Sequence, residues 1–251
     1  MLFEEEQNAP GKEVAYIVKS RKRFDMRRRS KRKAESEETC YMCDRPSVTR
    51  EHAPPLAFFP SDRRGNLITV PSCTSHNNDN SKDVEYIRNI VVTDINTNEL
   101  ARPMFRSKVL PSFRRSPKLK RQTFARCREV FVWGMNSAVV DTDPTRLNKV
   151  MKAIVSALYF HDFGEKFGYP WSVHGATMVP FSNVSNTTTP QMNALFRSIP
   201  TTDRDTNQPD VFKYGVYRSV EYGVIYKLVF YGGVDFYVFG VPPSSRFETR
   251  G

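Results

Sequence analysis

The chain has 251 residues and lacks any uninterrupted apolar run of 18 residues, and its mean hydropathy is −0.53. A membrane-spanning helix needs about 20 consecutive, predominantly apolar residues, so we expect none. The first ten residues, MLFEEEQNAP, are acidic and hold no apolar stretch of the kind found in secretory signal peptides. The sequence therefore predicts a cytoplasmic protein that has no membrane partner.

Cysteine is also scarce, with four residues in the whole chain. Without an export signal we expect a reducing compartment, where cysteines bind metal more often than they pair. Apolar residues make up 39% of the chain and aromatic residues 12%, which excludes wholesale disorder. The length suits one domain of moderate size or two small ones, and we find no internal repeat.

Acidic residues are nearly missing from two segments. Residues 19–33 hold ten basic residues and one acid, and residues 101–128 hold ten basic residues and no acid. These segments carry +9 and +10, which leaves the rest of the chain at −8 of the total of +11. Such segments are typical of proteins that bind a polyanion. The alternatives are solvated tails or loops and, for residues 21–33, a nuclear-localisation signal. The predicted nucleic-acid contacts in the two segments are Arg27, Arg28, Arg29, Arg114 and Arg115.

Three of the cysteines belong to two short motifs. Cys40 and Cys43 form a C-x2-C pair, and Cys73 and His76 form a C-x2-H pair that 29 intervening residues separate from Cys43. Together the two pairs supply the four donors of a tetrahedral structural zinc site. The alternative is that the three thiols are separate apolar fillers. Cys127 stands alone, and we expect it to be a buried structural thiol.

Oxygen and imidazole donors lie between and beside these pairs. Glu51 precedes His52, and Asn77 directly follows His76. A carboxylate next to a histidine offers a metal ligand and a general base, and Asn77 offers a second oxygen ligand. Oxygen ligands suit Mg²⁺ better than zinc. The sequence therefore predicts a structural Zn²⁺ and a separate catalytic Mg²⁺ or Mn²⁺.

With these motifs, in the stretches EHAPPLAFF and GNLITVPSCTSHNNDNSKD, the chain resembles the HNH endonucleases, also called ββα-metal or His-Me finger nucleases. The resemblance covers about residues 38–92. It implies that His52 is the general base, that Glu51 and Asn77 bind the catalytic metal, and that Asn66 braces the loop.

The chain differs from the usual family pattern at three positions. Glu51 replaces the usual Asp, His76 replaces the fourth zinc cysteine, and Asn77 replaces the last histidine. Asn78 and Asn80 are alternatives to Asn77 as the metal ligand. Each replacement keeps the type of donor atom that the metal prefers.

The resemblance implies hydrolysis of DNA phosphodiester bonds by a one-metal mechanism, with double-stranded DNA as the first candidate substrate and RNA as another. Arg50, Lys82 and the two basic segments would contact flanking phosphates. By analogy, such proteins belong to bacterial antiphage defence systems or mobile elements. One alternative is a zinc-stapled nucleic-acid-binding or assembly subunit without catalysis. Another is a nuclease subunit that a partner, such as an ATPase, activates through the C-terminal region.

The predicted fold class is α+β, with four parts. They are a basic N-terminal extension (1–38), a ββα-metal HNH module with a zinc knuckle pair (39–92), a basic linker (93–128) and an α+β accessory domain with an antiparallel sheet (129–251). Three prolines predict that residues 100–122 are extended.

Local signals place several elements in the accessory domain. Asp143 followed by Pro144 predicts a helix start, and apolar residues at helical spacing carry this helix to about residue 160. We expect strands at 129–140, 216–220, 224–231 and 234–241, with Gly232 and Gly233 as a two-residue hairpin turn. Residues 191–199 predict a short helix, and residues 200–210 a polar loop. A further strand is expected at 14–18.

Overall fold

The fold was analysed in a computed structural model, which describes residues 38–78, 80–125, 127–132, 135–140, 142–175, 194–196, 198–221 and 223–242. The chain divides into two compact units, Met1–Glu38 and Thr39–Gly251. The strand expected at 14–18 and the basic segment 19–33, with Arg27, Arg28 and Arg29, lie outside the described residues. Everything below concerns the second unit.

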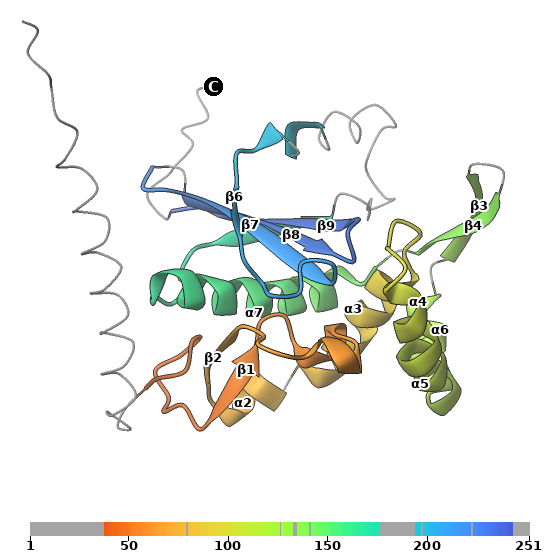
Figure 1. Ribbon diagram of the computed structural model, residues 1–251, viewed down its shortest axis with the longest axis horizontal. Helices are drawn as coiled ribbons and strands as arrows, with labels where there is room; N and C mark the ends of the chain where they lie inside the picture. Colours follow the sequence, from red (N-terminus) through yellow and green to blue (C-terminus); the bar gives the residue numbers. More distant parts are fainter. Residues whose placement is uncertain are drawn as a thin grey trace, which may run out of the picture. The chain divides into compact units, whose positions relative to one another are not determined.

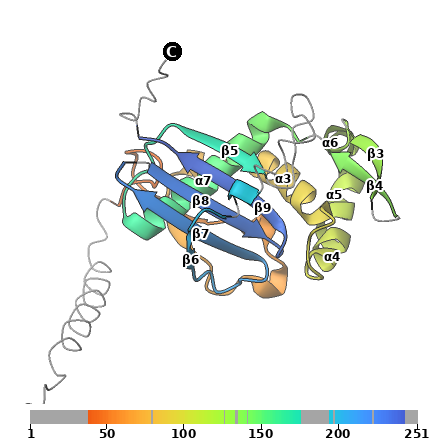
Figure 2. The same ribbon diagram turned by 90° about the horizontal axis from the view of Figure 1, so that it is seen from above.

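The α+β prediction is confirmed, and the larger sheet is antiparallel with five strands in the order β5-β9-β8-β7-β6. Figure 2 shows this sheet from above. Its strands are β5 (Trp171–Gly175), β6 (Thr202–Arg204), β7 (Phe212–Ser219), β8 (Gly223–Phe230) and β9 (Val234–Gly240). β8 and β9 lie within one residue of their predicted bounds, and β7 overlaps the strand predicted at 216–220 but starts four residues earlier. The short β6 lies inside the stretch that was expected to be a polar loop.

The turn between β8 and β9 contains three residues, Tyr231, Gly232 and Gly233, and not the two that were predicted. A Cβ atom on Gly233 would lie 2.1 Å from the backbone oxygen of Asn96, so this position requires glycine. The backbone N–H of Asn98 donates to the Tyr231 carbonyl at 2.8 Å. The turn is therefore shaped by the loop at residues 94–98, which is far away in the sequence.

Helix α7 (Pro144–Phe163) starts at the predicted position and extends slightly beyond its predicted end. The Asp143 carboxylate accepts from the backbone N–H groups of Thr145 and Arg146 at 2.9 and 3.3 Å, and this satisfies two donors of the first turn. Gly164 ends the helix in the left-handed conformation, with φ of 72°. The cap and the proline made this element predictable from local sequence.

Helix α7 lies between the five-stranded sheet and a smaller two-stranded sheet, as Figure 1 shows. On the sheet side, the Asp162 carboxylate accepts from the hydroxyls of Tyr214 and Tyr226 at 2.9 and 3.2 Å. Buried side chains from residues 40–92, from 101–119 and from 150–238 join in one hydrophobic cluster. The division of residues 39–251 into module, linker and accessory domain stays a prediction.

Residues 101–123 are helical, so the prediction of an extended segment is wrong. The pieces are α4 (Ala101–Met104), the π-helical η4 (Phe105–Val109), α5 (Leu110–Arg115) and α6 (Pro117–Thr123), which together we call the helical arm. Pro117 occupies the first turn of α6 after the capping residue Ser116, where the missing N–H has no intrahelical partner to lose, and Pro111 lies where the π-helical η4 passes into α5. None of the helices in the described stretches is both long enough and apolar enough to cross a membrane.

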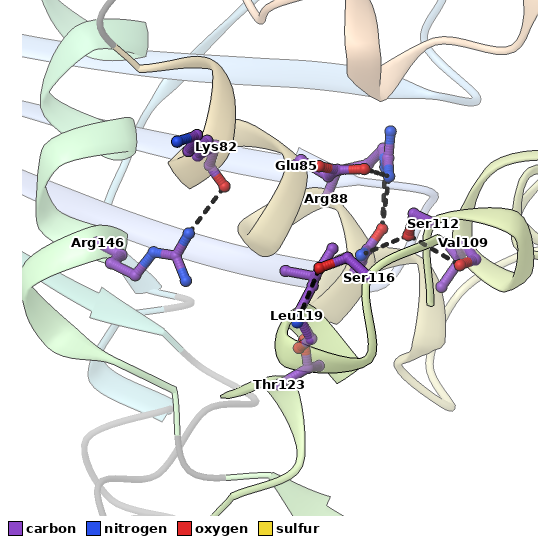
Figure 3. A network of polar contacts seen from close by, with 10 residues as sticks. Lys82, Glu85, Arg88, Val109, Ser112, Ser116, Leu119, Thr123 and Arg146 are labelled. Carbon is purple, nitrogen blue, oxygen red and sulfur yellow. Dashed lines mark hydrogen bonds and ion pairs between the residues drawn. The ribbon is translucent and has the colours of Figure 1, made fainter. Parts of the chain in front are cut away.

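A buried polar network holds the helical arm against helix α3 (Ser81–Thr93). The Arg88 guanidinium donates to the Asn89 side-chain oxygen, and the Asn89 amide donates to the Ser112 hydroxyl at 3.1 Å. The Ser112 hydroxyl in turn donates to the Val109 carbonyl at 2.8 Å. Figure 3 shows this network, which gives every buried group in it a partner and so fixes the arm in place.

The segment expected as one strand at 129–140 is a hairpin of β3 (Cys127–Val132) and β4 (Met135–Val140). Cys127 is exposed, which contradicts the prediction of a buried thiol. A two-stranded ribbon has no interior of its own, so a thiol on it is buried only where another element covers it. Of the predicted short helix at 191–199, the structure describes residues 194–196 and 198–199, and of these 194–196 and 198 are helical.

An ion-pair cluster between α3 and α7 leads to a stability prediction. Asp83 accepts from Arg146 at 2.8 Å and from Lys149 at 3.1 Å. Burial raises the pKa of Asp83, but these two cations outweigh burial and keep the pKa below its ordinary value. We expect Asp83→Asn to lower the free energy of unfolding at neutral pH by about 1–3 kcal/mol. Because the folded pKa is depressed, the difference from wild type should shrink as the pH falls below about 4.

Urea unfolding at neutral and at acidic pH measures this difference. Asp62→Asn is the matched control, because the Asp62 side chain is 78% exposed and its partner Arg63 lies 3.8 Å away. We expect a loss below about 0.5 kcal/mol for this control. Equal stability of Asp83→Asn and wild type at neutral pH would contradict the prediction.

Candidate metal centre and adjoining pocket

The site is built on a small antiparallel hairpin of β1 (Thr49–His52) and β2 (Thr69–Ser72), in which Glu51 faces Val70. The two short helices η2 (Leu56–Phe58) and η3 (Ser61–Arg63) lie between the strands, and α2 (Thr74–Asn78) and α3 follow β2. The Tyr231 hydroxyl donates to the Phe58 carbonyl at 2.6 Å, which ties the loop after β1 to the larger sheet.

The four predicted zinc ligands meet at the open end of this hairpin. Cys40 and Cys43 come from the turn that precedes β1, Cys73 directly follows β2, and His76 lies on α2. Their ligand atoms all lie within 4.8 Å of one another. The sulfurs of Cys43 and Cys73 are 3.9 Å apart, and the His76 Nδ1 atom is 3.2 Å from the Cys40 sulfur and 3.5 Å from the Cys73 sulfur.

These separations fit a tetrahedral zinc ion. Zn–S bonds of about 2.3 Å and Zn–N bonds of about 2.0–2.1 Å imply about 3.8 Å between sulfurs and about 3.6 Å between sulfur and nitrogen. Burial alone raises the pKa of the Cys40 thiol, but hydrogen bonds from the Met42 and Cys73 backbones and from His76 outweigh it and lower the pKa to about 6. The thiolate, which is the metal-binding form, is thereby favoured. The cluster could hold a metal ion such as zinc.

A pocket of about 200 Å³ adjoins the cluster. Its polar lining comes from Glu51 and His52 on β1, from Asn77 on α2, from Asn80 before α3 and from Tyr41 between the first two cysteines. The structure thus brings Glu51, His52 and Asn77 to one place. Helix α7 contributes an apolar wall of Val150, Ala153 and Ile154.

Burial sets the protonation of the two neighbouring groups on β1. It raises the pKa of the Glu51 carboxyl to about 7. It also lowers the pKa of His52, with a further contribution from the positive charge of Arg64. His52 is therefore neutral at physiological pH, as a general base must be, and Glu51 gains its charge most readily when a cation is nearby.

Two residues that line the pocket each have a buried polar atom with no hydrogen-bond partner among the described residues. These atoms are the side-chain oxygen of Asn80 and the hydroxyl of Tyr41. The Asn77 amide nitrogen donates to the Thr49 hydroxyl at 3.0 Å, which leaves the Asn77 oxygen for another partner. Buried polar groups normally have hydrogen-bond partners, so these oxygen atoms are available to contact a ligand in the pocket. One carboxylate and two amide oxygens are the ligand type that Mg²⁺ prefers.

Other predicted residues lie outside this pocket. Asn66 is exposed in a turn with φ of 54°, and its carbonyl accepts from the Asn207 side chain at 3.0 Å. Arg50 is exposed and donates to the side chain and the carbonyl of Thr69, both at 3.0 Å. Lys82 is exposed in the first turn of α3.

Further predicted residues are only partly placed. Arg114 and Arg115 are exposed at the end of α5. The side chain of Asn78 lies outside the described residues, so Asn77 and Asn80 are the asparagines that the structure places at the pocket.

Sequence reasoning missed Tyr41 and the contribution of α7. The position of Tyr41 between the first two zinc ligands is a local signal that it lies near the cluster. No local signal connects Val150, Ala153 and Ile154 to the pocket, because about 100 residues separate them from His52. Their helical spacing predicts that these side chains are buried, but it does not predict which segment of the chain they pack against.

Comparisons with protein-family models, with curated proteins and with solved structures found no match to this chain. The resemblance to the HNH endonucleases therefore rests on the motif residues themselves and supports only a proposal.

Proposed function

We propose that the chain is a metal-dependent endonuclease of the HNH type that hydrolyses DNA phosphodiester bonds. The observation that carries this proposal is the pocket shared by Glu51, His52 and Asn77 beside the Cys/His cluster. The resemblance implies this combination for the chemistry: a structural metal cluster next to a histidine, a carboxylate and amide oxygens.

In this proposal His52, which burial keeps neutral, accepts a proton from the attacking water. Glu51 and Asn77 would hold Mg²⁺ or Mn²⁺, which would supply positive charge that stabilises the developing negative charge of the phosphodiester in the transition state. Thr49 keeps the Asn77 amide in one orientation through its hydrogen bond. The apolar wall from α7 limits the access of bulk water and so strengthens the electrostatic interactions in the pocket.

Incubation of supercoiled plasmid with the purified protein tests the proposal. We expect nicked and linear products with Mg²⁺ or Mn²⁺ and none with EDTA. The ends should carry 5′-phosphate and 3′-hydroxyl groups, so DNA ligase should reseal the nicks without kinase treatment. Cleavage that proceeds equally in EDTA, or the absence of cleavage under conditions where the plasmid is bound, would contradict the proposal.

A second candidate function is nucleic-acid binding or assembly without catalysis. The observation that favours it is the set of exposed basic residues on the helical arm, none of which lines the pocket. It predicts salt-sensitive binding that needs no Mg²⁺.

A partner-activated nuclease is the third candidate, and it predicts that the isolated chain binds and does not cleave. A cytoplasmic role in antiphage defence or in a mobile element belongs to the proposal by analogy alone.

A further inference from the structure

A larger cleft of about 910 Å³ lies next to the pocket. Its walls come from the first turns of α3 and α7 and from α6 of the helical arm. Ser81 lines the pocket that contains His52, and the next residue, Lys82, lines the cleft. The first turn of α3 therefore lies between the two cavities, with Ser81 and Val84 facing the pocket and Lys82 and Glu85 facing the cleft.

The acidic groups of the cleft are already engaged. Asp83 is paired with Arg146 at 2.8 Å, and Asp143 accepts from the first-turn backbone of α7. Glu85 lies 3.6 Å from the Arg88 guanidinium. Asp83 and Glu85 are thus compensated by cations, whereas Asp143 keeps its negative charge and accepts from backbone N–H groups.

Two lysines of the cleft are not engaged in the same way. Lys82 and Lys118 are exposed, and neither side chain has an ion-pair partner among the described residues. The helical arm continues this surface with the exposed residues Arg114, Arg115 and Arg121, which likewise have no ion pair in the part of the chain that the structure describes. At the cleft the two lysines outnumber the one carboxylate, Asp143, for which no cationic partner is found among the described residues.

The walls of the cleft are held in place before any ligand arrives. The Arg146 guanidinium donates to the Lys82 carbonyl at 2.8 Å and stacks over the Tyr86 ring at 4.1 Å. The Ser116 hydroxyl accepts from the Leu119 N–H at 3.2 Å at the start of α6. Figure 3 shows Lys82 and Arg146 on one side and Ser116 with Leu119 on the other. Binding here costs little rearrangement of the protein.

We propose that this cleft binds the phosphodiester backbone of one nucleic-acid strand, with Lys82 and Lys118 as phosphate contacts, and leads that strand to the His52 pocket. The inference rests on the proposed function, because it names the path of the same substrate. The volume lies in the range of about 300–1,000 Å³ that holds a ligand of small-molecule size, so the cleft admits a few nucleotides of one strand.

Binding measured without cleavage tests the cleft. Fluorescein-labelled oligonucleotide, single-stranded in one arm and duplex in the other, is titrated in EDTA over a series of salt concentrations, with fluorescence anisotropy as the readout. Each lost phosphate contact should reduce the slope of log K against log salt by about 0.7 for a single strand and about 0.9 for a duplex. We expect Lys82→Gln and Lys118→Gln each to reduce the salt slope by this amount and to bind the oligonucleotide more weakly at low salt.

Lys213→Gln is the matched control, because it removes the same charge from another exposed lysine, on β7. The neighbouring Tyr214 bonds to Asp162 of α7, so Lys213 points to the opposite face of the sheet. Its salt slope should equal that of wild type. The proposal is overturned if neither cleft variant changes the slope in either arm, or if Lys213→Gln changes it equally.

The same measurement separates the cleft from the nuclease proposal. If the plasmid is never cleaved and the slopes still fall, the cleft stands and the catalytic proposal fails. If the plasmid is cleaved and the slopes do not change, the cleft is wrong and the catalytic proposal stands. The arm in which the slope falls shows whether the bound strand is free or part of a duplex.

Discussion

Replacement of His52 by alanine is expected to reduce the rate of Mg²⁺-dependent plasmid cleavage by roughly 10²–10⁴-fold, the usual contribution of a general base. His52 lies at the end of β1, lines the pocket, and has a pKa below its ordinary value because of burial and of Arg64. It is therefore in the proton-accepting form at neutral pH. No other histidine among the described residues shares the pocket except His76, whose Nδ1 atom belongs to the Cys/His cluster.

Time courses of nicking at saturating Mg²⁺ measure this effect, and zinc content and circular dichroism show whether the variant is folded. His161→Ala is the control, because His161 is exposed in the last turn of α7 and does not line the pocket. Its rate should stay within about twofold of wild type. A folded His52→Ala variant that cuts as fast as wild type would show that His52 is not the base.

Replacement of Cys73 by serine is expected to remove the bound metal and to destabilise the hairpin by several kcal/mol. Structural zinc binding contributes about 10–16 kcal/mol in zinc-finger peptides, although part of that is spent on ordering the site. Strands β1 and β2 have four residues each, and isolated two-stranded hairpins are marginally stable. Cys73 directly follows β2, so loss of the metal also releases the pocket that Glu51 and His52 line.

Metal analysis of the purified protein and thermal unfolding test this expectation together. Wild type should carry one zinc ion per chain, and Cys73→Ser should carry far less and unfold at a lower temperature. Cys127→Ser is the matched control, because Cys127 is exposed on β3 and lies outside the cluster. It should keep both the zinc content and the melting temperature of wild type. Full zinc occupancy in the Cys73→Ser variant would rule out the predicted ligand set.

Several features follow from the sequence alone because they depend on residues that are close together in the chain. Two ligands three residues apart must lie on one turn, which is why the Cys40–Cys43 and Cys73–His76 pairs predicted a metal cluster. The Asp143 carboxylate accepts hydrogen bonds from the first turn of the helix that begins at Pro144. Because both residues are adjacent in the chain, the start of α7 was predictable. Alternating apolar residues likewise predicted β7, β8 and β9.

Other features were decided only by the tertiary structure. The wall of the pocket comes from Val150, Ala153 and Ile154, the three-residue turn at Gly233 depends on Asn96, and the helical arm forms although prolines interrupt it. Each of these depends on which distant surface a segment covers, and apolar periodicity reports burial without naming the partner. Short-range spacing thus determined the Cys/His cluster and the main elements, whereas long-range packing determined the pocket and the cleft in which the proposed chemistry would occur.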